Sequence, residues 1–449
     1  MTSSPMALRS GVITRYAIGS IGTGGFATLP GLVLVFYLTD TLGVAAWAAG
    51  IVVTVAKIWD VLIDPVIGGI SDTSLHRTGS RHRLMTIGAL ALPVFFLATF
   101  AVPAGIGPAA AAVWVGLAFV LASTAFSLFQ VPYIALPAEL SARYDQRTRL
   151  LTARVAVLSL AILLFGAGGP MLRAIGDPYT GYVVMALVAG VVIAAGMLVA
   201  TTIAPRGAAN PSAPRSSWTS GYRDGIAALR RSAPFRALLI TFGLQAVATG
   251  IMLAGANYVA VWVMRSDDAL TFLFVALIAP AIVCSPLWNT VARRIGKERG
   301  FVVASVLFAV ATASLTAAVW TPGSWMYVSV AVAGAAYAGM QALPMAMLPD
   351  VISHDARTSG PANAGIFGGV WTAGETTGMA VGAAALTLIL TVTGYVQTVA
   401  GTTVTQPASA VAGIAFGFSL VPALLTLVSL IFLAGYRLRR ADIDQPEDA

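Results

Sequence analysis

Twelve long apolar runs are the feature that most constrains what this chain can fold into. They lie at roughly 16–38, 45–70, 84–103, 109–137, 151–172, 181–203, 236–264, 270–291, 300–320, 324–348, 362–394 and 409–435. A helix that crosses a bilayer needs about 20 mostly apolar residues, and each run is long enough. The runs therefore predict an all-α membrane protein of twelve transmembrane helices.

Composition supports a membrane protein and argues against several other classes. Of the 449 residues, 58% are hydrophobic and 10% are charged, whereas a soluble domain carries about 25% charge. The single cysteine, Cys284, excludes an internal disulfide. No nucleophile–base pair or metal-ligand cluster is visible, so we expect no enzyme activity, no metal and no cofactor.

The basic residues follow a topological pattern. They are concentrated in alternate loops, for example Arg77, Arg81 and Arg83 after the second run and Arg293 and Arg294 after the eighth. Because basic residues stay on the cytoplasmic side, both termini should be cytoplasmic. This placement also explains the net charge of +8 without nucleic-acid binding. The Ala, Val, Gly and Arg bias suggests a GC-rich bacterial genome and so a bacterial inner (cytoplasmic) membrane.

The chain reads as two similar halves. A Pro-, Ser- and Arg-rich stretch at 204–235 is typical of a linker. It separates a six-helix bundle at 1–203 from another at 236–435, with a cytoplasmic tail at 436–449. Proline pairs recur in the fourth and tenth runs, Pro132/Pro137 and Pro344/Pro349. Two pseudo-symmetric six-helix bundles related by a parallel repeat are the design of major facilitator transporters, which work by alternating access.

The second run carries charges where lipid should make them costly. Lys57, Asp60 and Asp64 are three and four residues apart, which places them on one helix face. Ionisable groups at the bilayer centre usually have a role. The two carboxylates could bind Na⁺ or share a proton, and Lys57 could balance the charge when no cation is bound. A salt bridge that only fixes the helix is the alternative.

Several segments resemble one transporter family, the glycoside–pentoside–hexuronide:cation symporters of the major facilitator superfamily. They are KIWDVLIDP (57–65), ATLPGLVLVFYLTDTLG (27–43), FQVPYIALPAELSARYDQRTRL (129–150) and LPDVISHDARTSGPANAGIFGGVWTAGETTG (348–378). The resemblance implies cation-coupled uptake of a sugar or glycoside. Asp60 and Asp64 match the family's cation-site aspartates, and Arg154 matches an arginine that lines the sugar site. Trp371 and Glu375 sit on the helix that borders the same cavity.

The chain departs from galactoside-type members at three positions. Gln130 stands where they have an acid, Gly24 where they have an aspartate, and Thr376 where they have a lysine. With Gln130 the cation site has fewer negative oxygens, which favours H⁺ over Na⁺.

Some of these positions have structural alternatives. Gln130 could bind the cation or substrate, or make an interhelical hydrogen bond. Asn257 could contact substrate or bond a neighbouring helix. Packing is the alternative for Trp371, and snorkelling is the alternative for Arg154.

Six charged residues near the predicted cytoplasmic loops are candidates for gating: Asp72, Arg77, Asp145, Arg147, Asp355 and Arg357. In the loop at 71–83, Asp72 could pair with arginines, and Asp145–Arg147 and Asp355–Arg357 could form matching pairs. Alternatively, the arginines only keep the loops inside.

The function predicted from the sequence is a cation-coupled symporter of a sugar or glycoside, driven by H⁺ or Na⁺. We expect a monomer surrounded by lipid whose partner is a small molecule, not nucleic acid. A carrier of an amphipathic lipid or an exported metabolite is one alternative. A non-transporting receptor or scaffold is another, but it would not need paired acids inside the membrane.

Overall fold

The computed structural model describes residues 9–140, 144–204, 229–266, 268–359, 364–402 and 404–436, together with residues 227 and 438. Within this part of the chain, twelve helices have the length and apolar character needed to cross a membrane, which confirms the predicted spans. Of the expected linker at 204–235, residues 204, 227 and 229–235 lie inside the described part, and of the expected tail only residues 436 and 438 do.

The helices group into two compact units. Most residues up to 204 belong to the first unit and most from 229 onward to the second, except that 45–54 group with the second and 398–402 with the first. The first unit contains α1 (Ser10–Ile18), α2 (Ser20–Asp40), most of α3 (Ala46–Thr78), α4 (His82–Phe100), α5 (Pro108–Leu140), α6 (Tyr144–Arg173) and α7 (Pro178–Thr201).

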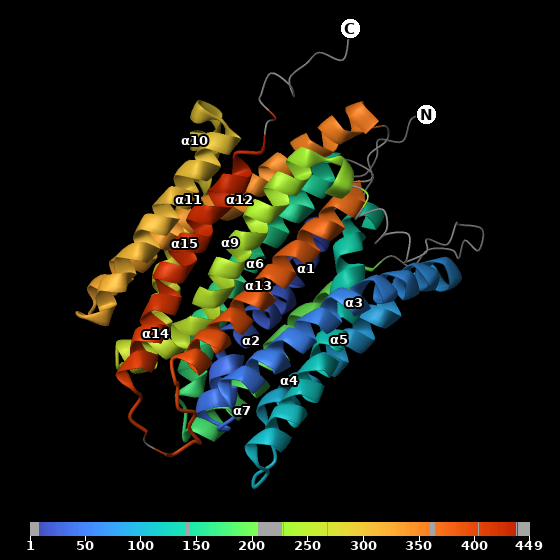
Figure 1. The fold of residues 1–449 in the computed structure, drawn as a ribbon. Coiled ribbons are helices and arrows are strands. Elements are labelled where there is room, and N and C mark those ends of the chain that lie inside the picture. The colour runs from blue at the N-terminus through green and yellow to red at the C-terminus, as the bar shows by residue number, and fades with distance from the viewer. Residues whose placement is uncertain are drawn as a thin grey trace, which may run out of the picture. The chain divides into compact units, whose positions relative to one another are not determined.

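The helices of the second unit are coloured from light green to red in Figure 1. This unit contains α9 (Ala233–Tyr258) with a π-helical turn (Val259–Val263), α10 (Ala269–Ile295), α11 (Lys297–Ser314) with a 3₁₀ turn (Leu315–Val319), α12 (Trp325–Ser359), α13 (Ala364–Val392), α14 (Ala408–Phe418) and α15 (Leu420–Leu433).

Four of the helix contacts in the first unit recur in the second. In the first, α2 packs on α6 and α7, and α4 packs on α5 and α7. In the second, α9 packs on α13 and α15, and α11 packs on α12 and α15. When the membrane spans are counted along the chain, each helix of the second set lies six spans after its counterpart in the first set. The internal repeat inferred from the proline pairs is therefore present in the packing.

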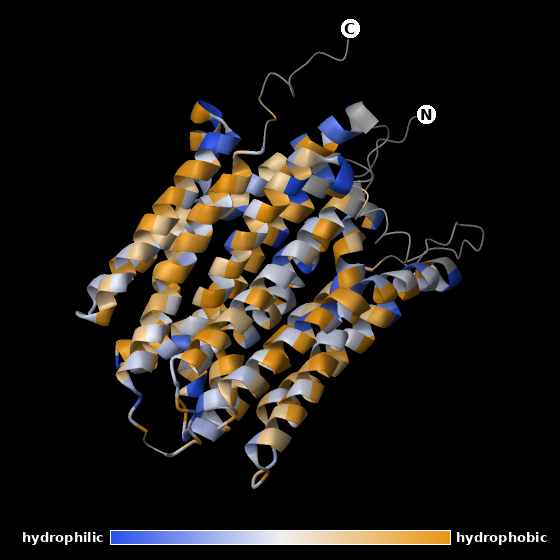
Figure 2. Ribbon diagram, viewed as in Figure 1, coloured by the Kyte–Doolittle hydropathy of each residue, from blue (hydrophilic) through white to orange (hydrophobic). Residues whose placement is uncertain are grey.

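Each unit exposes apolar side chains where a soluble protein would expose polar ones. On α3 the exposed residues Ile51, Val55, Ile58 and Leu62 recur at helical spacing and form one stripe. Hydrophobic residues cover most of α4, α5, α10 and α11 (Figure 2). These surfaces are suited to lipid.

Close helix contacts inside each unit depend on glycine. A Cβ added to Gly250 of α9 would lie 2.6 Å from the carbonyl oxygen of Met379 on α13. Only a residue without a side chain permits this approach, which matches the small-residue packing of membrane helices.

The helices extend further than the apolar runs suggest. The predicted loop at 71–83 is mostly helix, because α3 continues to Thr78 and α4 begins at His82. Likewise α12 continues to Ser359, so Asp355 and Arg357 lie on a helix. Hydropathy identifies only the part of a helix that lies in lipid. Backbone hydrogen bonds continue the helix past the end of that apolar part.

Candidate functional site

The charged face of α3 lies opposite its lipid-facing stripe. At 100° per residue, Lys57, Asp60 and Asp64 fall on the side away from Ile51 and Val55. Lys57 Nζ lies 3.0 Å from Asp60 Oδ2, with side-chain exposures of 30% and 14%. The ion pair uses one oxygen of Asp60. The other oxygen, Oδ1, is buried without a hydrogen-bond partner.

Asp64 also has a carboxylate oxygen that receives no hydrogen bond. It is hydrogen-bonded to Ser127 of α5, yet its Oδ1 is buried and has no partner. Trp59 fixes α3 to the same helix, since its Nε1 donates to Thr124 Oγ1 at 2.8 Å. Two buried carboxylate oxygens without donors are chemically suited to a proton or a hard cation. These two oxygens are therefore suitable ligands for the predicted coupling ion.

Gln130 makes the interhelical bond that was one of its two predicted roles. Thr23 of α2 donates to Gln130 Oε1 at 2.7 Å. The oxygen retains a second lone pair, and the amide group retains donors. Gly24, one residue further along α2, packs against α6: a Cβ there would lie 2.8 Å from Ala161 Cβ. An aspartate at position 24 has no room in this unit.

Arg154 of α6 faces an aromatic cluster of the first unit. Its guanidinium carbon lies 5.5 Å from the centre of the Tyr133 ring, and its Nε is buried without a partner. Tyr133 stacks on Tyr16 and donates to the Tyr16 carbonyl at 2.6 Å. Arg154 thus has hydrogen-bond donors to spare beside a π-face, which suits a polyhydroxyl ligand.

The second unit holds the remaining substrate candidates. Trp371 of α13 is 2% exposed and stacks on Phe242 at 4.3 Å between ring centres, so packing accounts for its ring. Its indole nitrogen is buried without a partner. Glu375, one turn on, is half-buried and hydrogen-bonded to Gln341. Thr376 is half-buried beside it.

Asn257 is the most deeply buried of the predicted site residues. It lies at the end of α9, just before the π-helical turn, and is fully buried. Neither atom of its amide has a hydrogen-bond partner. The helix–helix bond that was its alternative role is therefore not formed, and the amide remains available to a ligand or water.

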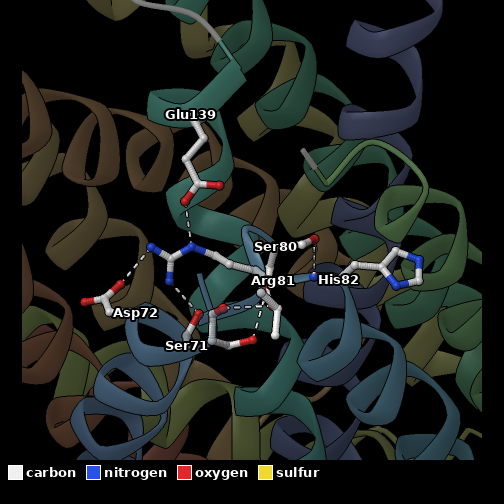
Figure 3. Close-up of polar contacts among 8 residues, drawn as sticks. Ser71, Asp72, Ser80, Arg81, His82 and Glu139 are labelled. Carbon is white, nitrogen blue, oxygen red and sulfur yellow. Dashed lines mark hydrogen bonds and ion pairs between the residues drawn. The ribbon is translucent and has the colours of Figure 1, made fainter. Parts of the chain in front are cut away.

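A cluster of charged side chains surrounds Arg81 at one end of the first unit (Figure 3). Arg81 lies 2.6 Å from Glu139 Oε1 and 2.7 Å from Asp72 Oδ1, and it also donates to Ser71. Burial lowers the pKa of Arg81, but hydrogen bonds and charge from Glu139 and Asp72 outweigh burial and raise it above its ordinary value. Asp72 therefore pairs with Arg81. Arg77, the predicted gating arginine, is exposed.

The second unit has a counterpart of this cluster. Lys297, at the start of α11, lies 2.5 Å from Asp350 of α12, as Arg81 before α4 pairs with Glu139 of α5. Asp355 forms an ion pair with Arg231, whose Nε lies 3.0 Å away. This pair raises the pKa of Arg231.

Asp355 and Arg357, which were predicted as one gating pair, each have another partner. Arg357 is exposed and donates to the Ser353 carbonyl of its own helix. The ion pair of Asp355 is with Arg231, a residue from before α9 that the sequence argument did not single out. The side chains of Asp145 and Arg147 lie outside the described residues.

Reasoning from sequence missed Glu139, Lys297 and Asp350, and it did not single out Arg81 among the arginines of 71–83. The repeat contains the signal: a basic residue follows the second and eighth spans, and an acid follows Pro137 and Pro349 within two residues. Superposing the halves on those prolines would have identified both pairs.

Comparisons with known proteins give the family. The model of a family described as "MFS/sugar transport protein" matches residues 15–440. An uncharacterized symporter of Synechocystis is 24% identical, covering 95% of this chain and 94% of that protein. A glucuronide carrier protein homolog of Escherichia coli is 23% identical over 95% of this chain and 92% of its own length.

A mouse protein named sodium-dependent lysophosphatidylcholine symporter 1 is 24% identical, over 75% of this chain and 69% of that protein. Among solved structures, the nucleoside transporter NupG has a TM-score of 0.69 at 11% identity, covering 96% of this chain and 100% of that one. This last likeness concerns the fold. Because the family model spans nearly the whole chain, this protein belongs to the MFS/sugar transport protein family, whose members are membrane transporters and not enzymes.

Proposed function

We propose that this chain is a cation-coupled symporter of a sugar or glycoside in a bacterial inner membrane, with both termini in the cytoplasm. The observation that carries the proposal is the pair of buried carboxylate oxygens on α3, Asp60 Oδ1 and Asp64 Oδ1, which have no hydrogen-bond donor. A proton or Na⁺ would satisfy both. The names of the relatives, which include a glucuronide carrier homolog and several symporters, support the same function.

The coupling follows from charge. Without a cation, Lys57 neutralises one aspartate and the other charge is costly inside the membrane. A bound cation neutralises the second charge and so favours the conformation that accepts substrate. Because coupling is reciprocal, substrate in turn tightens the cation. Arg154, with its unpartnered Nε beside Tyr133, is the proposed donor to sugar hydroxyls.

A second candidate substrate is an amphipathic lipid. The similarity to the mouse lysophosphatidylcholine symporter supports it. The coupling site on α3 would serve either substrate, so the same experiment must include both classes.

The test is the thermal stability of the purified protein against glycosides and lysolipids, in Na⁺ or choline, at two pH values. A ligand that binds the native state raises the apparent Tm. We expect a glycoside shift that grows with Na⁺ or with acidity, according to the coupling ion. Asp64→Asn should remove the dependence of the glycoside shift on Na⁺ or acidity. Asp72→Asn, the same change on the same helix but outside the acid pair, should keep it. A Tm shift with lysolipids alone would favour the lipid as substrate. A glycoside shift that still grows with the cation in Asp64→Asn would contradict coupling through the acid pair.

A further inference from the structure

The second unit contains a small, partly open cavity beside Glu375, one of the substrate candidates of α13. It has a volume of about 10 Å³, which is the lower limit for a single water-sized occupant. Its polar lining comes from α9, α12 and α13: Gln245, Thr249, Tyr337, Gln341 and Glu375. All five belong to the second unit, whereas the acid pair on α3 belongs to the first.

The orientation of the Gln245 amide is fixed by its neighbours. Its Nε2 lies 2.9 Å from Ser305 Oγ and 3.1 Å from Ser429 Oγ. Ser429 already donates its only hydroxyl hydrogen to the Thr426 carbonyl at 2.6 Å, so it can only accept from Gln245. The nitrogen therefore faces α11 and α15, and the carbonyl oxygen is left for the cavity. That oxygen is buried without a partner in a residue that is 2% exposed.

The other polar groups supply both acceptors and donors, because Tyr337 has a hydroxyl hydrogen and Gln341 has amide hydrogens. The Thr249 hydroxyl donates to the Gln245 backbone carbonyl at 3.1 Å, which leaves its lone pairs free for a ligand. Gln341 Nε2 donates to Tyr337 Oη at 2.6 Å, and Gln341 is also bonded to Glu375. The cavity therefore presents a carboxylate, an amide carbonyl and a hydroxyl oxygen.

We propose that this cavity is a second cation site, which binds Na⁺ through Glu375, Gln245 Oε1 and Thr249 Oγ1. Uncharged and anionic oxygens are the ligands that hard cations prefer. The site carries one formal negative charge, which a monovalent ion neutralises within the membrane span. The ion would join α9 to α13 and so stabilise the second unit independently of the acid pair on α3 and of any sugar.

The experiment uses the full chain with Asp60→Asn and Asp64→Asn as its background, so that the acid pair on α3 cannot respond. NaCl replaces choline chloride at constant ionic strength, and the apparent Tm is followed. We expect Na⁺ to raise the Tm in a saturable way in this background. Adding Glu375→Gln should abolish the rise. Adding Thr249→Val, which removes one oxygen and keeps the shape, should weaken Na⁺ affinity several-fold. Glu298→Gln, an acid of the same unit that does not line the cavity, should change nothing.

Two results would overturn the site. One is loss of the Na⁺ response in the Asp60→Asn/Asp64→Asn background, which would place all Na⁺ binding on α3. The other is an Na⁺ response that survives Glu375→Gln. If Glu375→Gln does not fold, the affinity of the Thr249→Val protein decides, and an unchanged value contradicts the proposal. A protein that binds no sugar but keeps the Glu375-dependent response would contradict the symport proposal and leave this one standing.

Discussion

Arg81 is the residue on which the polar contacts at one end of the first unit converge. Its guanidinium joins the end of α3, through Asp72 and Ser71, to the end of α5, through Glu139. Its side chain is 9% exposed, that of Glu139 is 18% and that of Asp72 is 47%. The Glu139 contact is therefore the stronger, because exposed ion pairs contribute little.

Replacing Arg81 should be much more damaging than replacing Asp72. We expect Arg81→Ala to lower the free energy of unfolding by about 2–4 kcal/mol, since it leaves Glu139 buried without a counter-charge. Asp72→Asn should cost less than about 1 kcal/mol. Unfolding midpoints in detergent measure both, with the exposed Arg77→Ala as control. Equal losses for Arg81→Ala and Arg77→Ala would show that the cluster does not hold these helix ends together.

For single residues, the sequence predicts which helix face a charged side chain lies on better than it predicts the ion-pair partner of that side chain. Spacing alone placed Lys57, Asp60 and Asp64 on one face, and in the structure Lys57 forms an ion pair with Asp60. Asp72 pairs with Arg81, one of the arginines of 71–83 that were expected as its partners. The pairing of Asp355 with Arg231 was not predicted, because the two residues are 124 positions apart in the sequence. Helical periodicity carries no information about such contacts.

At the scale of helices, glycines decide how closely neighbours approach. Gly250 of α9 lies against the backbone of α13, where a Cβ would be 2.6 Å from the Met379 oxygen. Gly243 lies two turns earlier on the same helix, and a Cβ there would have nothing within 4 Å.

These two glycines give a matched pair of substitutions. Gly250→Ala should lower the free energy of unfolding by about 1–3 kcal/mol, because the helices must separate or distort. Gly243→Ala should be neutral, or stabilising by up to about 1 kcal/mol through the entropy of the unfolded chain. Thermal or chemical unfolding measures both. Similar effects of the two changes would mean that the α9–α13 contact adapts freely.

The turn between α10 and α11 requires glycine because of its backbone conformation, and not because a neighbouring atom is close. Gly296 has φ 91° and ψ 155°, a region that essentially only glycine occupies. Gly296→Ala should cost about 1–3 kcal/mol, although a Cβ there would meet no atom within 4 Å. Unfolding of the variant beside Gly243→Ala isolates the backbone effect. A neutral result would mean that this turn readily adopts another conformation.

Helix number and order were predictable, but helix ends were not. Apolar runs located all twelve spans because lipid requires length and hydrophobicity. They stopped short for α3 and α12, whose last turns are polar and extend past the apolar segment. The predicted gating loops are consequently helical, which changes how Asp72 and Asp355 are held.

At the scale of the whole molecule, the twelve spans and the distribution of basic residues predict the topology. Cys284 is the only cysteine, so Cys284→Ser gives a background for labelling with an impermeant maleimide. In intact cells, Ala104→Cys, between α4 and α5, should react. Arg294→Cys, at the end of α10, should react only after permeabilisation. The reverse pattern would invert the topology and contradict cytoplasmic termini.

The central claim is that the acid pair on α3 couples a cation gradient to substrate movement. Its most direct test is accumulation of a glycoside, found by the binding panel, in proteoliposomes with an imposed Na⁺ or H⁺ gradient. Counterflow without a gradient is measured in parallel. Wild-type protein should accumulate the glycoside, whereas Asp64→Asn should still exchange it by counterflow but fail to concentrate it. Gradient-driven accumulation by Asp64→Asn at the wild-type level would contradict the account.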